Sequence, residues 1–319
     1  MKNSRILQKY KVFKIRLFLF FIAIFAVNIV CGQQKPVFSQ YMFNPMAINP
    51  AFAGTQEQLN LSALYRNQWV NLKGSPTIIT FSGNTGIPTK NIGLGFVLSK
   101  DQIGIHSDVG LYLSYAYHLR LGKDKLLSLG LQGGFNNLIS DFNLLELKDD
   151  NDPNLSGVYS KFNPNFGMGL FYMSKKFYAG LSIPYIVNTR FFREEDVVSD
   201  ARAKRYYFLT AGYVIDLNSR LQFKPEFMIR IQEGSPFGYD VNGKFIIDKK
   251  VSLGVSYRSG DAVIGTFEFQ MNENFRLGYA YEYVLSDLSY FTRGSHEIMI
   301  NYRTASLLKR KSKHCPTYF

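Results

Sequence analysis

The chain has 319 residues, 46% of them hydrophobic and 16% aromatic, and carries a formal net charge of +13. Six of those charges lie in residues 1–32 and four in residues 305–319, which leaves +3 (13 − 6 − 4) for the body of the chain. A body so close to neutral gives no reason to expect nucleic acid as a partner. Of the two cysteines, Cys31 lies at the edge of the N-terminal segment, so we expect no intramolecular disulfide in the rest of the chain.

Residues 1–32 have the pattern of a signal peptide. Six basic residues and no acidic residue precede an apolar run at 17–30. That run is short for a membrane-spanning helix, which needs roughly 20 apolar residues. We therefore predict secretion with cleavage before Gln33. An uncleaved anchor and lipid attachment at Cys31 are the alternatives.

Residues 33–57 form an aromatic segment with two Asn-Pro steps. Residues 34–54 read QKPVFSQYMFNPMAINPAFAG, and Asn-Pro steps initiate turns. A disordered linker does not carry apolar side chains this densely. We expect the segment to fold back onto the strands that follow, as a plug or a rim clasp. The alternative is a docking surface for a partner.

Residues 58–304 show a period of two, which places successive side chains on opposite faces of a sheet. In 91–99, for example, Leu94 and Leu98 share one face while Gly93 and Ser99 share the other. Apolar residues facing lipid and small or polar residues facing a lumen are typical of a transmembrane barrel. We therefore predict an all-β fold, a transmembrane antiparallel β-barrel of about 14 strands in the cell outer membrane. The predicted strands are 59–70, 77–86, 92–100, 108–121, 126–136, 165–173, 177–186, 206–215, 221–232, 239–247, 251–258, 262–271, 275–285 and 296–303.

The connections between these strands support the same topology. The turns from even to odd strands are short, whereas the connections from odd to even strands include the long ones at 137–164, 187–205 and 286–295. Outer-membrane barrels have short periplasmic turns and long outer loops. An even strand number then places both ends of the barrel chain in the periplasm.

The same alternation predicts which side chains face the lumen. We expect a charge-paired interior that fills the barrel, because buried charges are tolerated when paired; an ion-conducting lumen is the alternative. On this basis Arg at Leu94 should be costly, whereas Gln at Gly93 should be tolerated. The predicted inward set is Lys224, Glu226, Arg230, Glu268, Gln270, Arg276, Glu282, Glu297, Asn301 and Arg303.

Prolines and glycines interrupt some of the predicted strands. Pro184 and Pro225 lack the N–H that a sheet ladder uses, so we expect bulges there. The glycines at 130, 133 and 134 predict a close approach or a bend.

Signatures of catalysis are missing: the four histidines are scattered, and there is no G-x-S-x-G elbow and no zinc-ligand spacing. We expect no enzyme activity, no cofactor and no metal.

Three motifs together resemble one family. They are FSQYMFNPMAINPAFAG at 38–54, YRNQWVNLKGSPT at 65–77, and SHEIMINYR at 295–303 followed by a basic tail that ends in CPTYF. This combination resembles the PorP/SprF family of type IX secretion membrane proteins. The resemblance implies a non-enzymatic outer-membrane barrel of the secretion and gliding system, which serves the secretion and surface attachment of adhesins through their C-terminal domains.

The resemblance also suggests partners. They are the C-terminal domain of a secreted adhesin, type IX components on the periplasmic side, and outer-membrane lipid. Trp and Arg dominate binding hot spots, although a lone Trp near a strand end is also typical of an interface anchor. A general diffusion porin or small-solute transporter is the alternative function. The residues predicted to bind the partner are Tyr41, Asn44, Pro45, Asn49, Pro50, Arg66 and Trp69.

Overall fold

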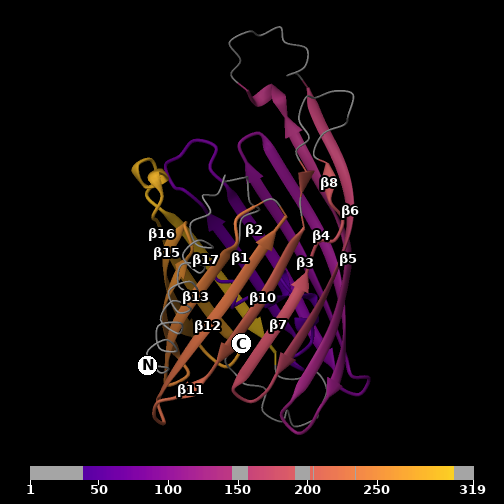
Figure 1. The fold of residues 1–319 in the computed structure, drawn as a ribbon, viewed down its shortest axis with the longest axis vertical. Helices are drawn as coiled ribbons and strands as arrows, with labels where there is room; N and C mark the ends of the chain where they lie inside the picture. The colour runs from indigo at the N-terminus through magenta and orange to yellow at the C-terminus, as the bar shows by residue number, and fades with distance from the viewer. Residues whose placement is uncertain (1–38, 146–156, 191–201, 204, 234, 305–319) are drawn as a thin grey trace, which may run out of the picture. The chain divides into compact units, whose positions relative to one another are not determined.

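A computed structural model describes residues 39–145, 157–190, 202–203, 205–233 and 235–304 (Figure 1). The predicted signal peptide, residues 33–38 and the tail at 305–319 lie outside the described residues. Among the described residues, no helix is long and apolar enough to cross a bilayer.

The described strands, apart from a short pair at 189–190 and 202–203, form one closed antiparallel barrel. β10 pairs with both β7 and β12, and β1 pairs with both β2 and β17, so the sheet has no free edge in its paired region. β11 (Ile215–Asp216) continues the register of β10 after Val214, which gives a 14-strand barrel as predicted. Its strands are β1 (Asn60–Asn67), β2 (Thr77–Ile87), β3 (Ile92–Ile103), β4 (His106–Arg120), β5 (Leu126–Asp141), β6 (Val158–Met173), β7 (Phe177–Ile183), β10 (Tyr206–Tyr213), β12 (Leu221–Gln232), β13 (Gly238–Ile247), β14 (Val251–Arg258), β15 (Ala262–Gln270), β16 (Phe275–Val284) and β17 (Ser295–Arg303).

The alternation of side chains agrees with the sequence. Leu94 and Leu253 are 42% and 48% exposed on the outside of the barrel, whereas Ser256 and Ile264 are each 1% exposed on the inside. None of the predicted lumen-facing charged residues lies on the exposed outer face, and Lys224, Glu282 and Glu297 are each 1% exposed. These charges are paired, for example Lys224 with Glu226 at 2.8 Å. The prediction of a charge-paired interior is confirmed.

The two ends of the barrel differ in their connections. Short turns join β2 to β3, β4 to β5, β6 to β7, β13 to β14 and β15 to β16 at one end, here called the inner end. The other, outer end carries the longer loops, although β3 and β4 are joined there by Gly104 and Ile105 alone. β8 (Thr189–Arg190) and β9 (Arg202–Ala203) form a separate two-stranded sheet within the connection from β7 to β10. Because outer-membrane barrels have short turns on their periplasmic side, we expect the inner end to face the periplasm.

The predicted loop at 137–164 is wrong at both of its ends. β5 runs to Asp141 and β6 begins at Val158, so both strands extend well past the predicted limits. Asn163-Pro164 indicates a turn by sequence, but Pro164 pairs with Phe135 inside β6. Proline is tolerated here because β7 pairs with β6 only from Met168 to Met173, which leaves the other side of β6 without a strand partner.

The two prolines with expected bulges behave differently. β7 ends at Ile183, directly before Pro184. Beyond it, the Ile186 N–H donates to the Phe166 carbonyl at 2.8 Å, one residue out of the register that pairs Met168 with Ile183. An extra residue is therefore inserted at Pro184, as expected. Pro225 causes no bulge: it pairs with Gly243 in an unbroken β12–β13 register, and the interruption falls on the neighbouring strand at Val214.

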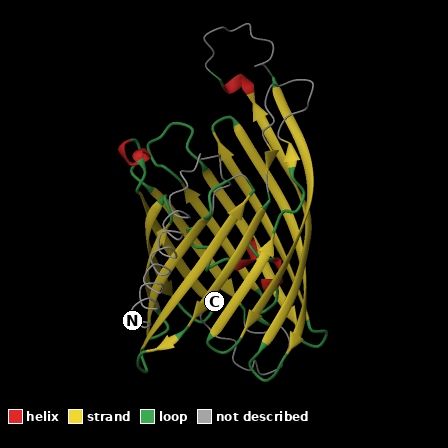
Figure 2. Ribbon diagram, in the orientation of Figure 1, coloured by secondary structure: helices red, strands yellow, loops and turns green. Residues whose placement is uncertain are grey.

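Residues 39–57 fill part of the lumen and are here called the plug. Each Asn-Pro step starts a short 3-10 helix, η1 (Pro45–Ala47) and η2 (Pro50–Phe52), as the turn prediction implies. Proline suits the first helical position because its missing N–H has no partner there in any case. Figure 2 shows these helices enclosed by the strands. Met46, Ala51 and Phe52 are at most 2% exposed, so the segment folds into the lumen.

Candidate functional site: a plug anchored in the lumen

The plug rests on a set of inward-facing glycines. A Cβ atom at Gly93 on β3 would lie 1.9 Å from the Ala53 carbonyl oxygen, and one at Gly130 on β5 would lie 2.2 Å from the Ala51 nitrogen. A Cβ at Gly169 on β6 would lie 2.0 Å from the Asn49 side-chain oxygen. These three residues are here called the seat glycines. Only glycine lets the plug backbone approach the wall this closely.

The seat glycines correct one prediction and confirm another. Gln at Gly93 was expected to be tolerated because the position faces the lumen, but its side chain would overlap the plug at Ala53. The close approach predicted for the glycines of β5 is found at Gly130. It is also found at Gly134, where a Cβ would lie 2.1 Å from the Leu111 carbonyl oxygen.

Apolar packing and hydrogen bonds hold the middle of the plug. The Phe52 ring meets the Phe171 ring of β6 edge-on at 5.4 Å between centroids. Burying one such side chain stabilises the folded state by about 1.5–3 kcal/mol. The side chains of Asn49 and Ser182 make hydrogen bonds across the gap, Asn49 Nδ2 to the Leu170 carbonyl at 3.1 Å and Ser182 Oγ to the Ile48 carbonyl at 2.6 Å. Nearer the inner end, His118 Nε2 donates to the Ala53 carbonyl at 3.0 Å.

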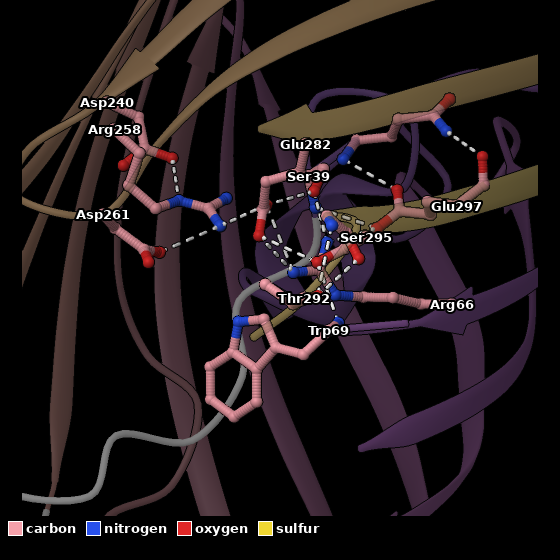
Figure 3. A network of polar contacts seen from close by, with 12 residues as sticks. Ser39, Arg66, Trp69, Asp240, Arg258, Asp261, Glu282, Thr292, Ser295 and Glu297 are labelled. Atoms are coloured by element: carbon pink, nitrogen blue, oxygen red, sulfur yellow. Dashed lines mark hydrogen bonds and ion pairs between the residues drawn. The ribbon is translucent and has the colours of Figure 1, made fainter. Parts of the chain in front are cut away.

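The first described residues of the plug are held by charges near the outer end (Figure 3). The backbone N–H groups of Ser39 and Gln40 donate to the two carboxylate oxygens of Glu297 at 2.9 and 2.8 Å. Arg66 of β1 forms ion pairs with Glu282 at 3.1 Å and Glu297 at 3.3 Å, and also contacts Ser39 Oγ. Arg66, Glu282 and Glu297 are each 1% exposed. Breaking one buried pair of this kind strongly destabilises a protein, because the other charge stays buried.

The network continues around the wall from Glu282. Arg258 on β14 pairs with Glu282 at 2.9 Å and with Asp240 on β13 at 3.1 Å. Asp261 follows β14 in the turn, and its Oδ2 lies 3.7 Å from Arg258 Nη1. Burial raises the pKa of the Asp261 carboxyl above its ordinary value, while the positive charge of Arg258 acts to lower it. Ser39, Arg66, Arg258, Glu282 and Glu297 are together called the outer anchor.

Trp69 lies at the outer rim beside this anchor (Figure 3). Its backbone has a φ of 53°, a left-handed conformation that is uncommon for tryptophan. The backbone N–H of Trp69 donates to Ser295 Oγ at 3.3 Å. The Val70 N–H donates to the Gly294 carbonyl, and the Val70 carbonyl accepts from the Arg293 N–H. These contacts tie the β1–β2 loop to the β16–β17 loop directly above the outer anchor. The indole N–H of Trp69 is buried and finds no hydrogen-bond partner among the described residues.

The seven predicted partner-binding residues do not share one surface. Arg66 and Trp69 lie together at the outer anchor, whereas Asn49 lies deep in the lumen against β6. Most of the seven side chains are buried and none is exposed. Glu282 and Glu297 were predicted to face the lumen, but their contact with the plug was not predicted. The signal that could have indicated this contact is the presence of two inward-facing acidic residues that can pair with Arg66. Buried are Tyr41, Asn44, Asn49, Pro50 and Arg66; half-buried are Pro45 and Trp69.

Comparison with known proteins decides the family. Residues 30–302 match the family described as type IX secretion system membrane protein PorP/SprF. The chain belongs to the PorP/SprF family. No curated protein matches it. As the family implies, it is a membrane barrel of the type IX secretion system, and this is not a known enzyme family. As a PorP/SprF barrel it belongs in the outer membrane.

Solved structures with a similar fold include a transporter, a channel and an outer-membrane protein. The toluene transporter TbuX of Ralstonia pickettii has 10% identity and a TM-score of 0.48, over 81% of this chain and 91% of that one. The monoaromatic hydrocarbon channel CymD has 12% identity and a TM-score of 0.46, over 86% and 94%. Omp33 of Acinetobacter baumannii has 10% identity and a TM-score of 0.44, over 77% and 98%. Similarity at this level carries nothing about what this PorP/SprF protein transports or binds.

Proposed function

We propose that this PorP/SprF protein is a closed, non-enzymatic barrel that helps to secrete or anchor a cell-surface adhesin through the C-terminal domain of that adhesin. The observation that carries the proposal is the plug. It contacts β3, β5, β6, β16 and β17 from within the lumen, which favours a partner that binds at the rim over one that passes through the barrel. The adhesin domain therefore engages the protein at the outer rim, and type IX components engage it from the periplasm.

The plug in the lumen argues against the alternative of a diffusion porin. An open porin needs a water-filled channel through the barrel. Here Ala51 and Phe52 of η2 occupy the space beside β4, β5 and β6, and Met46 of η1 packs against Gly95 of β3. In planar bilayers the intact protein should give little or no current, and a variant that lacks residues 39–54 should conduct. A steady current through the intact protein, equal to that of the deletion variant, would contradict the closed barrel.

The role of the plug in adhesin display is tested by replacing both of its Asn-Pro steps. Asn44, Pro45, Asn49 and Pro50 are changed to Ala, and display of the adhesin is measured by surface labelling of intact cells. The control is the change Asn163→Ala with Pro164→Ala, the Asn-Pro step in β6 outside the plug. We expect a folded, heat-modifiable barrel in both variants and loss of display only in the plug variant.

Two other outcomes would overturn this assignment. If the plug variant yields no barrel in the outer membrane, the segment is needed for the fold and its partner role is not supported. If barrel and display are both normal, the site assignment is wrong.

A further inference from the structure

A small basic cavity lies at the inner end of the barrel, away from the outer anchor. Its volume is about 20 Å³, roughly the space of one or two water-sized groups. Four of its lining residues are cationic and one is a carboxylate: Lys244, Lys249, Lys250, Arg276 and Glu268. Ile246, Ser252 and Gln270 complete the lining. The excess of positive charge favours an anionic group inside the cavity.

The turn that supplies two of the lysines is strained. Asp248 and Lys249 have φ angles of 48° and 57°, and the Lys250 N–H closes the turn onto the Ile247 carbonyl at 2.9 Å. Two consecutive left-handed residues define a type I′ turn, in which Asn-Gly or Asp-Gly is preferred. A lysine at the glycine position costs stability that the turn itself does not need. Its side chain lines the cavity.

The back of the cavity is preorganised by buried contacts. Lys244, which is 5% exposed, is paired with Glu268, and Arg276 Nη1 lies 3.8 Å from the same carboxylate. Gln270 Oε1 accepts a hydrogen bond from Arg276 Nε at 2.8 Å, which fixes the guanidinium plane. Arg276 also lies over the Phe43 ring of the plug at 5.6 Å from its centroid. The cationic groups are thus held in place before any ligand arrives.

We propose that this cavity binds a carboxylate group of an acidic peptide segment presented from the periplasm. Lys244 and Arg276 already hold the Glu268 carboxylate at the back of the cavity, and the further positive charge of Lys249 and Lys250 favours a second carboxylate at its mouth. Charge-assisted hydrogen bonds from lysine and arginine to a carboxylate are about twice as strong as neutral ones. Lys249 and Lys250, exposed at the mouth, attract the segment and hold neighbouring acidic residues. The site is separate from the proposed adhesin function, and either can fail without the other.

The test uses the full-length protein in detergent, with triglutamate as the probe and triglutamine and inorganic phosphate as comparison ligands. Binding is measured by isothermal titration calorimetry at low and high salt. The variant is K249Q with K250Q, and the control is K123Q with K125Q, two exposed lysines in another short turn at the same end. We expect triglutamate to bind, triglutamine not to bind, and the K249Q/K250Q pair to weaken binding at least tenfold. The control pair should change the affinity less than twofold.

The outcomes separate the sources of the anion. If phosphate binds as tightly as triglutamate and competes with it, the cavity is a site for free anions and the peptide proposal is overturned. If the intact protein binds neither probe, or if both lysine pairs weaken binding equally, the positive charge is not organised into a site. If the K249Q/K250Q variant binds triglutamate more weakly than the intact protein does, while its binding of phosphate is unchanged, the proposal is supported.

Discussion

At the scale of single residues, the barrel is specified by buried charges that satisfy one another. Arg66 faces two carboxylates, Glu282 and Glu297, and the backbone of Ser39 and Gln40 supplies two more donors to Glu297. Burying any one of these charged groups alone would cost free energy, but together they leave few charges in the lumen without a partner. The first residues of the plug are therefore part of the ionic interior of the barrel.

Replacing Arg66 with Met should reduce the free energy of unfolding by about 3–5 kcal/mol, because Glu297 then stays buried without its cation. Adding Glu297→Gln should recover about 1–2 kcal/mol, since it removes the stranded charge. The measurement is the urea midpoint of unfolding in detergent micelles. As a control, Arg120→Gln breaks a pair with Glu57 whose side chains are 47% and 29% exposed, and should cost less than about 1 kcal/mol. Equal losses for Arg66→Met and Arg120→Gln would show that the outer anchor adds no stability.

At the scale of elements, the plug and the strand wall are fitted to each other. The seat glycines come from three different strands, β3, β5 and β6, and each meets a different part of the chain between Asn49 and Ala53. Side chains there would force the plug away from the wall.

Gly130→Ala should therefore destabilise the plug by about 1–3 kcal/mol, the usual range for overpacking. Gly265→Ala is the matched control, since Gly265 lies in β15 and a Cβ there meets nothing within 4 Å. The measurements are the temperature at which the heat-modified band changes mobility and the bilayer current. A Gly130→Ala protein as stable and as closed as the Gly265→Ala protein would refute the close fit.

The strands and the close approach at Gly130 could be predicted from sequence, but the rest of the seat and the contact of the anchor with the plug were not. A period of two survives in every strand because one face meets lipid and the other meets a polar lumen. The extra length of β6 is hard to predict because an Asn-Pro step such as Asn163-Pro164 favours a turn, and β6 accommodates it where one of its sides lacks a strand partner. The contact of Arg66 with Glu297 joins residues on the first and last strands, so it exists only once the barrel has closed.

At the scale of the whole molecule, the fold makes the two ends of the barrel chemically different. The outer end holds the anchor, Trp69 and the longer loops, whereas the inner end holds short turns and the basic cavity. β1 begins and β17 ends at the inner end, as an even number of strands requires.

Epitope tags test this orientation. A tag inserted between Leu145 and Gly157, in the β5–β6 connection, should be labelled by antibody on intact cells. Tags in the β4–β5 turn at 122–125 and after Phe319 should be labelled only after the outer membrane is permeabilised, because short turns and chain ends face the periplasm. The reverse pattern, with the turn tag labelled on intact cells and the loop tag protected, would invert the topology.

The path of the plug also constrains how the protein is made. The described part of the plug runs from Ser39 near the outer end past Gly54 near the inner end, and the chain then reaches β1 at Asn60, the strand that closes the ring against β17. Ser39 and Glu297 are 258 positions apart, so their contact is among the last that a growing chain can form. Because Ser39 contacts Arg66 on β1 and Glu297 on β17, we expect plug burial and closure of the β1–β17 seam to be coupled during assembly.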